Sequence, residues 1–123
     1  MNYVENAQNV TYKFNSYQDN TLIIDNNAYN KTMLLTPLHY RTMDTELFDN
    51  LNIETLTNLL EEFPNTEQLY IGSGEDFRKL PTDIVAYLHS REIAVESLAS
   101  NLLPAIHLIM MEEERNYLML VYL

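Results

Sequence analysis

Cysteine is absent from the 123 residues, and basic side chains are scarce. The lack of cysteine excludes disulfides, thiolate metal sites and cysteine nucleophiles, and it is typical of a reducing compartment. Only 7 residues are basic against 18 acidic ones, which gives a formal net charge of −11. Because nucleic-acid affinity comes mainly from lysine and arginine at phosphates, this charge argues against nucleic acids and anionic membranes as partners. It attracts a partner protein with a basic surface, or it serves solubility alone.

Long hydrophobic runs are also lacking. The longest nearly apolar tracts, residues 101–111 and 117–123, are far shorter than the roughly 20 residues of a membrane-spanning helix. The N-terminal segment 1–10 has neither a basic region nor an apolar stretch, unlike a signal peptide. We therefore expect one soluble, cytoplasmic domain over residues 1–123, without stable membrane insertion. Whether the protein forms a homo-oligomer is left open by the sequence.

The first third of the chain is expected to form β-strands. Alternating or β-rich apolar patterns predict strands at 10–14, 21–25 and 31–36. Asp25-Asn26-Asn27 follows the second of them, and because Asp and Asn tolerate a left-handed backbone we expect a hairpin turn there. Residues 38–50 show no clear pattern.

From residue 52 onward, helical patterns alternate with strand patterns. Asn52 is a suitable N-cap for a first helix that Pro64 ends. Pro81 suits the first turn of a second helix, and Ser100 can cap a third helix over about 101–114. The remaining apolar segments predict strands at 67–71, 93–97 and 116–123. This alternation predicts an α/β sheet after a β-rich start.

Glycine is also scarce, since Gly72 and Gly74 are the only two in the chain. A Gly-x-Gly loop after a strand can cradle a phosphate. The dinucleotide fingerprint, however, needs a third glycine where Phe77 stands, and the Gly-Lys-Ser/Thr of the Walker loop is absent. Glu75 and Asp76 would also repel a phosphate. We therefore expect no nucleotide and no other cofactor, and a positive φ at one glycine.

A resemblance to a known family begins at these glycines. The segment "LYIGSGEDFRKLPTDIVAYLHSREIAVESL", residues 69–98, resembles the small-domain family that includes mitochondrial complex I assembly factor 3 and bacterial and archaeal relatives of unknown function. The segment 21–37 resembles the opening hairpin of that family. The residues that match its pattern in the C-terminal half are Ile71, Gly72, Ser73, Gly74, Leu80, Pro81, Val95, Glu96, Ser100 and Glu113-Glu114-Arg115.

The resemblance implies a single three-layer α/β domain with a central mixed sheet, a β-rich N-terminal half and three helices. It implies a role in assembly or protein interaction more than the catalysis of a known reaction. Two departures stand out: Ile106-His107-Leu108 occupy the place of the family's usual Thr-Tyr-Asn, and Glu114 replaces a glycine. If the polar triplet forms a ligand site in relatives, that site is altered or lost here.

The residue types of a hydrolase triad are present as Ser73, Asp76 and His107. Ser73 lies in Gly-Ser-Gly instead of the Gly-x-Ser-x-Gly elbow that exposes a nucleophile, so we expect no triad. His107 lies among apolar residues, which is typical of a core or interface histidine. His89 and Glu92 could share a metal, but two ligands are too few and a solvated helix end is the simpler interpretation.

The acidic run Glu112-Glu113-Glu114 lies at the end of the last predicted helix. Such a run is usually a solvated helix end, although acidic charge is unfavourable next to the negative end of the helix dipole. Arg115 follows directly, and we expect it to pair with Glu113 or Glu112.

Two functions remain from the sequence. The first is a non-enzymatic protein-interaction or assembly module, with Tyr40 as a partner contact. The alternative is a small-molecule-binding protein or enzyme whose cleft lies between the Gly72-Ser73-Gly74 loop and the start of the last helix near Ser100, with Arg115 as a further candidate. A deep polar pocket flanked by Ser73 and Ser100 would favour the alternative. A filled cleft beside an exposed apolar patch would favour the interaction module.

Overall fold

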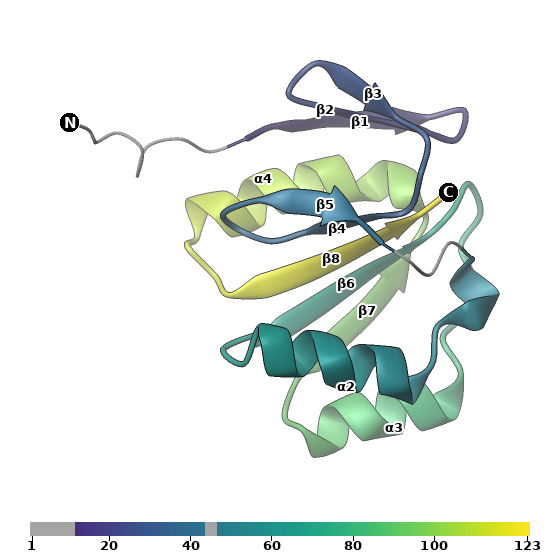
Figure 1. Cartoon of the computed structure of the whole chain (residues 1–123), viewed down its shortest axis with the longest axis vertical. Coiled ribbons are helices and arrows are strands. Elements are labelled where there is room, and N and C mark those ends of the chain that lie inside the picture. Colours follow the sequence, from purple (N-terminus) through teal and green to yellow (C-terminus); the bar gives the residue numbers. More distant parts are fainter. Residues whose placement is uncertain (1–11, 44–46) are drawn as a thin grey trace.

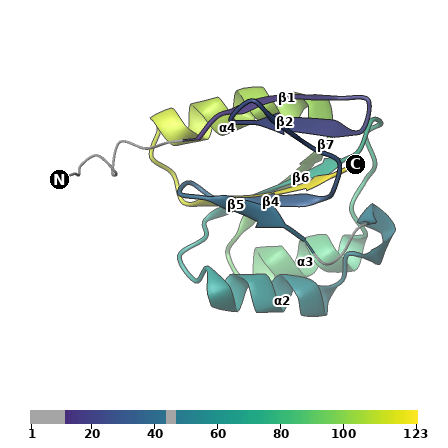
Figure 2. The same cartoon turned by 45° about the horizontal axis from the view of Figure 1, so that its top comes forward.

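The computed structural model describes residues 12–43 and 47–123. Within them, three layers are stacked (Figures 1 and 2). A five-stranded sheet forms the middle layer, two helices cover one of its faces, and a small three-stranded sheet and a third helix cover the other. This arrangement confirms the expected α/β fold.

The middle sheet is mixed, with the strand order β5-β4-β8-β6-β7. β6 runs parallel to both β7 and β8, whereas β4 runs antiparallel to β8 and to β5. The carboxyl ends of β6, β7 and β8 therefore meet at one edge of the sheet. The strands are β4 (Met33–Leu35), β5 (Tyr40–Thr42), β6 (Gln68–Ser73), β7 (Ala94–Leu98) and β8 (Tyr117–Tyr122).

Helices and short 3₁₀ turns connect these strands. α2 and α3 lie side by side beneath the sheet, and α4 lies on the opposite face next to the small sheet (Figure 2). The elements are η1 (Phe48–Asn50), α2 (Ile53–Glu62), α3 (Thr82–Ser90), η2 (Ser100–Leu102) and α4 (Leu103–Glu112). Among the described residues, no helix combines the length and hydrophobicity that a bilayer crossing requires.

Each face of the middle sheet has its own hydrophobic core. Leu34 of β4 packs with the leucines of α2 and α3, whereas its neighbours Met33 and Leu35 pack with α4 and the small sheet. Side chains alternate between the two faces of a strand, so a strand with a core on both sides must be apolar throughout. β8 shows this most fully, because all six of its residues are buried.

The small sheet corrects the expected hairpin. Its strands β1 (Phe14–Gln18), β2 (Thr21–Ile24) and β3 (Asn27–Tyr29) form an antiparallel meander. The turn at Asp25-Asn26 is present, but it joins β2 to β3 and not to residues 31–36. That later segment instead becomes β4 of the middle sheet, beside β8. The part of the predicted strand 10–14 that precedes residue 12 lies outside the described residues.

The helix starts were predicted with mixed success. Asn52 caps α2 as expected, since its side-chain oxygen accepts a hydrogen bond from the Thr55 amide at 2.8 Å. The prediction that Ser100 caps the last helix is wrong. Ser100 begins η2, its side chain makes no cap bond, and α4 starts only at Leu103.

Several turns adopt a left-handed backbone without glycine. Positive φ angles occur at the hairpin residues Asp19, Asn20, Asp25 and Asn26, and at Glu92 and Glu114 after α3 and α4. After α4 the Glu114 amide donates to Met111 and the Arg115 amide to Met110, both at 3.2 Å, which is the Schellman pattern. Glu114 therefore occupies a position where glycine is preferred.

Candidate functional site

The glycine loop lies where β6 ends, beside the C-terminus of the chain. Gly74 has a φ of 100°, which confirms the expected positive φ at one glycine. A Cβ at this position would lie 2.7 Å from the backbone oxygen of Leu123. Both the backbone conformation and the lack of space therefore require glycine at Gly74.

Gly72 is required for a different reason. An added Cβ there would lie 2.5 Å from Ser100 Oγ and 2.7 Å from Leu103 Cδ1. Gly72 therefore lets η2 and the start of α4 pack directly against the backbone of β6. Both glycines therefore serve close packing at this sheet edge.

Ser100 is the residue that this close approach positions. Its hydroxyl accepts a hydrogen bond from the Gly74 amide at 2.9 Å and donates one to the Tyr122 carbonyl at 2.8 Å. The side chain is fully buried. We call this arrangement the Ser100 bridge, because it ties the glycine loop, η2 and the end of β8 together. Its hydroxyl is used within the fold.

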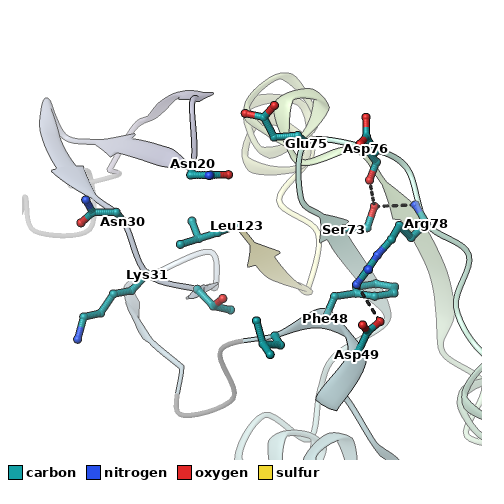
Figure 3. A pocket seen from close by; sticks show the side chains of 12 residues that line it. Asn20, Asn30, Lys31, Phe48, Asp49, Ser73, Glu75, Asp76, Arg78 and Leu123 are labelled. Atoms are coloured by element: carbon teal, nitrogen blue, oxygen red, sulfur yellow. Dashed lines mark hydrogen bonds and ion pairs between the residues drawn. The ribbon is translucent and has the colours of Figure 1, made fainter.

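Ser73 is also engaged by its own loop. Its hydroxyl accepts a hydrogen bond from the Arg78 amide at 2.9 Å and has the carbonyl of Asp76 at 2.8 Å as an acceptor (Figure 3). The Leu98 carbonyl lies within reach at 3.2 Å. With only 5% of its surface exposed, Ser73 stabilises the turn out of β6.

An open pocket of about 560 Å³ lies in front of Ser73. Figure 3 shows Arg78 reaching toward Asp49, with Lys31 on the opposite wall. Ser100 does not line this pocket, so the structure does not place Ser73 and Ser100 on the two sides of one cleft. The lining residues are Asn20, Asn30, Lys31, Thr32, Leu47, Phe48, Asp49, Ser73, Glu75, Asp76, Arg78 and Leu123.

The charged residues of this pocket include one ion pair. Arg78 Nη2 lies 2.9 Å from Asp49 Oδ1, and the guanidinium carbon lies 4.6 Å from the centroid of the Phe48 ring. With Glu75 and Asp76 added, three carboxylates line the pocket against the cations of Arg78 and Lys31. The pocket can hydrogen-bond a small polar molecule, and its net negative character disfavours a phosphate.

The residue types of a triad are not brought together. Ser73 pairs with Tyr122 at the end of β8, whereas His107 packs against Tyr117 at its start, with ring centroids 5.8 Å apart. Five residues of strand separate these positions, or about 16 Å. His107 therefore cannot act on Ser73.

His107 instead lies in an aromatic cluster between α4 and the small sheet. Its ring centroid lies 4.8 Å from that of Tyr12 and 6.2 Å from that of Phe14. The side chain is 3% exposed, and its Nε2 has no hydrogen-bond partner among the described residues. Burial lowers the pKa of His107 to about 4, because the charged imidazolium is poorly solvated there. His107 is thus a neutral core residue near pH 7.

Arg115 and Tyr40 lie apart from the glycine loop. Arg115 is at the opposite end of α4 from Ser100, with its Nε 3.8 Å from Glu113 Oε1, which confirms the expected pair. Tyr40 is half-buried, and its ring packs on those of Tyr12 and Tyr29 at 4.9 and 5.8 Å.

His89 and Glu92 are both exposed at the end of α3. Neither belongs to a group of three or more metal-ligating side chains, since the described part of the chain contains none. Their exposure is what a solvated helix end would show.

The outer face of α4 is the feature that the sequence reasoning missed. Its exposed apolar residues, together with Leu102 of η2, are Ala105, Leu108 and Ile109; Leu102 is 49% exposed, Leu108 60% and Ile109 47%. The exposed side chains of α2 are Glu54, Asn58, Glu61 and Glu62, and those of α3 are Thr82, Asp83, Ala86, His89 and Ser90. The signal was available, because residues 101–111 are apolar on all sides of the helix instead of on one stripe.

Comparisons with solved structures show the same fold in bacterial proteins. An NMR structure of a Xanthomonas campestris protein has a TM-score of 0.82 at 16% identity, over 92% of this chain and 85% of that one. A crystal structure of a Bordetella parapertussis protein has a TM-score of 0.80 at 15% identity, over 91% and 95%. A solution NMR structure of a Bordetella pertussis protein, described as a Mth938-like domain, has a TM-score of 0.73 at 14% identity, over 99% and 89%.

At these identities the structural likeness shows the fold alone. The sequence matches none of the curated proteins with which it was compared. Residues 14–121, however, match a family described as "Protein of unknown function (DUF498/DUF598)". This match covers the middle sheet, all three helices and the small sheet, so the chain belongs to the DUF498/DUF598 family.

Proposed function

We propose that this domain is a non-enzymatic module that binds another protein. The observation that carries the proposal is the outer face of α4, where Leu102, Leu108 and Ile109 are each about half exposed. A contiguous exposed apolar surface is typical of a binding site. The exposed residues of α2 and α3 are, by contrast, mostly polar.

The state of the serine hydroxyls supports the same proposal. Ser73 and Ser100 are both buried and hydrogen-bonded within the fold. A serine nucleophile needs a hydroxyl that is accessible and next to a general base. His107, the histidine among the triad residue types, packs against Tyr117 at the start of β8, whereas Ser73 pairs with Tyr122 at the end of that strand.

The resemblance to complex I assembly factor 3 and its relatives gives the proposal a biological direction. We propose that the bound protein is a component of a larger complex that is being assembled, and that the interaction takes place in the cytoplasm. The net charge of −11 supports a partner with a basic surface, because opposite charges speed association at moderate ionic strength.

A second candidate function is the binding of a small polar molecule in the pocket in front of Ser73. Its volume of about 560 Å³ and its lining by Lys31, Arg78 and Asp49 favour this alternative. The two candidates use different faces of the molecule, so one experiment separates them.

The experiment is affinity purification of the full chain from its native cells, at low and high salt, followed by mass spectrometry of proteins and small molecules. Wild type and the Tyr40→Ala variant are compared. We expect a protein that co-purifies at low salt and is reduced at high salt. If a metabolite co-purifies while no protein does under any condition, the pocket is the functional site and the interaction proposal is wrong.

A further inference from the structure

The outer face of α4 has the pattern of a helix-packing surface. Leu102, Ala105 and Leu108 form a row with a spacing of three residues, and Ala105 and Ile109 form a row with a spacing of four. These are the two kinds of ridge that interlock when helices pack. Ala105 is small and lies between the larger side chains, so it leaves a depression into which a side chain of a second helix fits.

A groove runs along one flank of this face. Its volume is about 590 Å³, and it lies between α4 and the strand segment that contains β1. Pro104, Ala105, Leu108 and Met111 form its apolar wall on α4, whereas Lys13 and Asn15 lie on the opposite wall. The groove and the exposed ridge are therefore one continuous surface that includes Leu108 and Ala105. We call it the α4 surface.

Negative charge is concentrated at one end of the α4 surface. Glu112 lines the groove, and Glu113 and Glu114 follow it at the C-terminal end of the helix. Three carboxylates at this end are unfavourable, because the helix dipole is negative there. Arg115 lies 3.8 Å from Glu113, a distance at the outer limit of an ion pair, and Lys13 lines the same groove as Glu112. Cations from a partner would remove this repulsion.

We propose that the α4 surface binds an amphipathic helix of the partner protein, with an apolar stripe that packs on Leu102, Leu108 and Ile109 and with lysine or arginine residues that reach Glu112–Glu114. This inference rests on the proposed function, and it specifies the surface and the partner element. The apolar rows of α4 supply the packing, and the acidic end fixes the direction and register of the bound helix.

The charges favour a basic helix over two other possible occupants of the α4 surface, a second copy of the chain and an anionic lipid surface. A second copy of the chain would bring together two molecules that each carry a net charge of −11. An anionic lipid surface would be repelled for the same reason. A basic helix satisfies both the apolar rows and the acidic end of the α4 surface.

The test begins with photo-cross-linking in living cells. A photoreactive phenylalanine analogue replaces Leu108 of the full chain, and in separate strains it replaces Asn58 of α2 or Ala86 of α3, which are exposed on the opposite side of the middle sheet. Mass spectrometry identifies the cross-linked segment. We expect position 108 to capture a protein segment that has apolar residues at a spacing of three and four and a net positive charge.

A synthetic peptide of the captured segment then measures affinity. We expect Leu108→Glu to weaken its binding by on the order of tenfold or more, and raised salt to weaken it further. Asn58→Glu adds the same charge on α2 and should leave the affinity unchanged. Leu108→Asn, which introduces the residue of the family pattern, should have an intermediate effect. Circular dichroism of both α4 variants checks that they are folded.

Each other outcome contradicts the inference. Protein cross-links from position 58 or 86 alone would sink it while leaving the proposed function intact. The same holds if position 108 captures an acidic or non-helical segment. A cross-link to a second copy or to lipid at position 108 would show a different occupant. Protein cross-links from none of the three positions would overturn both the inference and the proposed function.

Discussion

Replacing Gly72 by alanine probes how the Ser100 bridge holds the sheet edge together. The added Cβ would lie 2.5 Å from Ser100 Oγ, so the serine must move. It would then lose its hydrogen bonds with the Gly74 amide and the Tyr122 carbonyl. A buried polar group left without its partner costs about 1–3 kcal/mol. We therefore expect Gly72→Ala to lower the free energy of unfolding by about 3 kcal/mol.

A double-mutant cycle shows whether the bridge is the cause. Ser100→Ala removes the same two hydrogen bonds and should also cost about 3 kcal/mol. In that variant the closest obstacle to the new Cβ is gone, and the remaining ones are the flexible end of Leu103, at 2.7 Å, and the backbone Cα of residue 100, at 3.1 Å. The double variant should then lose only about 4 kcal/mol instead of the roughly 6 kcal/mol of independent effects.

Urea unfolding followed by circular dichroism measures these differences, and thermal unfolding should show a drop of roughly 10 °C for each single variant. Ser90→Ala is the matched control, since its hydroxyl bonds the Tyr87 carbonyl at an exposed helix end. Ser90→Ala should lower the free energy of unfolding much less than Gly72→Ala or Ser100→Ala does. Additive losses in the cycle, or a Gly72→Ala variant as stable as wild type, would refute the role assigned to the Ser100 bridge.

Three further predictions follow from single residues. Glu114→Gly should raise the free energy of unfolding by about 1 kcal/mol, because Glu114 has a φ of 55°; an unchanged urea midpoint would contradict this. His107 has a pKa of about 4 when folded against about 6.5 unfolded, so the unfolded chain binds more protons between these values and stability should fall as the pH drops from 6.5 to 4, by up to about 3 kcal/mol. His107→Leu should remove most of this slope in urea titrations at each pH, and an equally steep slope in the variant would refute the assignment. Calorimetry with millimolar ATP, GTP or NAD should show no specific heat; a saturable signal abolished by Gly74→Val in a folded variant would overturn our interpretation of the glycine loop.

Much of the fold could be predicted because its signals are local. The cap at Asn52 depends on a side chain and an amide three residues away, and the buried strand β8 is a continuous apolar run. The Asp25-Asn26 turn follows from the backbone preferences of its own residues. Periodicity and turn chemistry act over a few residues, and a single sequence displays them directly.

What the sequence did not reveal depends on partners far along the chain. Residues 33–35 do not form the expected hairpin. They pair instead with β8, more than 80 residues later in the chain, where both faces of the strand are buried. Ser100 is an ordinary N-cap residue type, yet Gly72 brings it within reach of Gly74 and Tyr122, which use its hydroxyl instead.

The α4 surface shows most clearly what could not be predicted from the sequence. The sequence alone determined that residues 101–111 form an apolar helix, because that follows from composition and spacing. Only the tertiary structure decided which of its sides is buried. The middle sheet and the small sheet cover Leu103, His107 and Met110, and they leave Leu102, Leu108 and Ile109 in water. A helix that is apolar all round carries no information about its own orientation, so the packing of distant strands had to supply it.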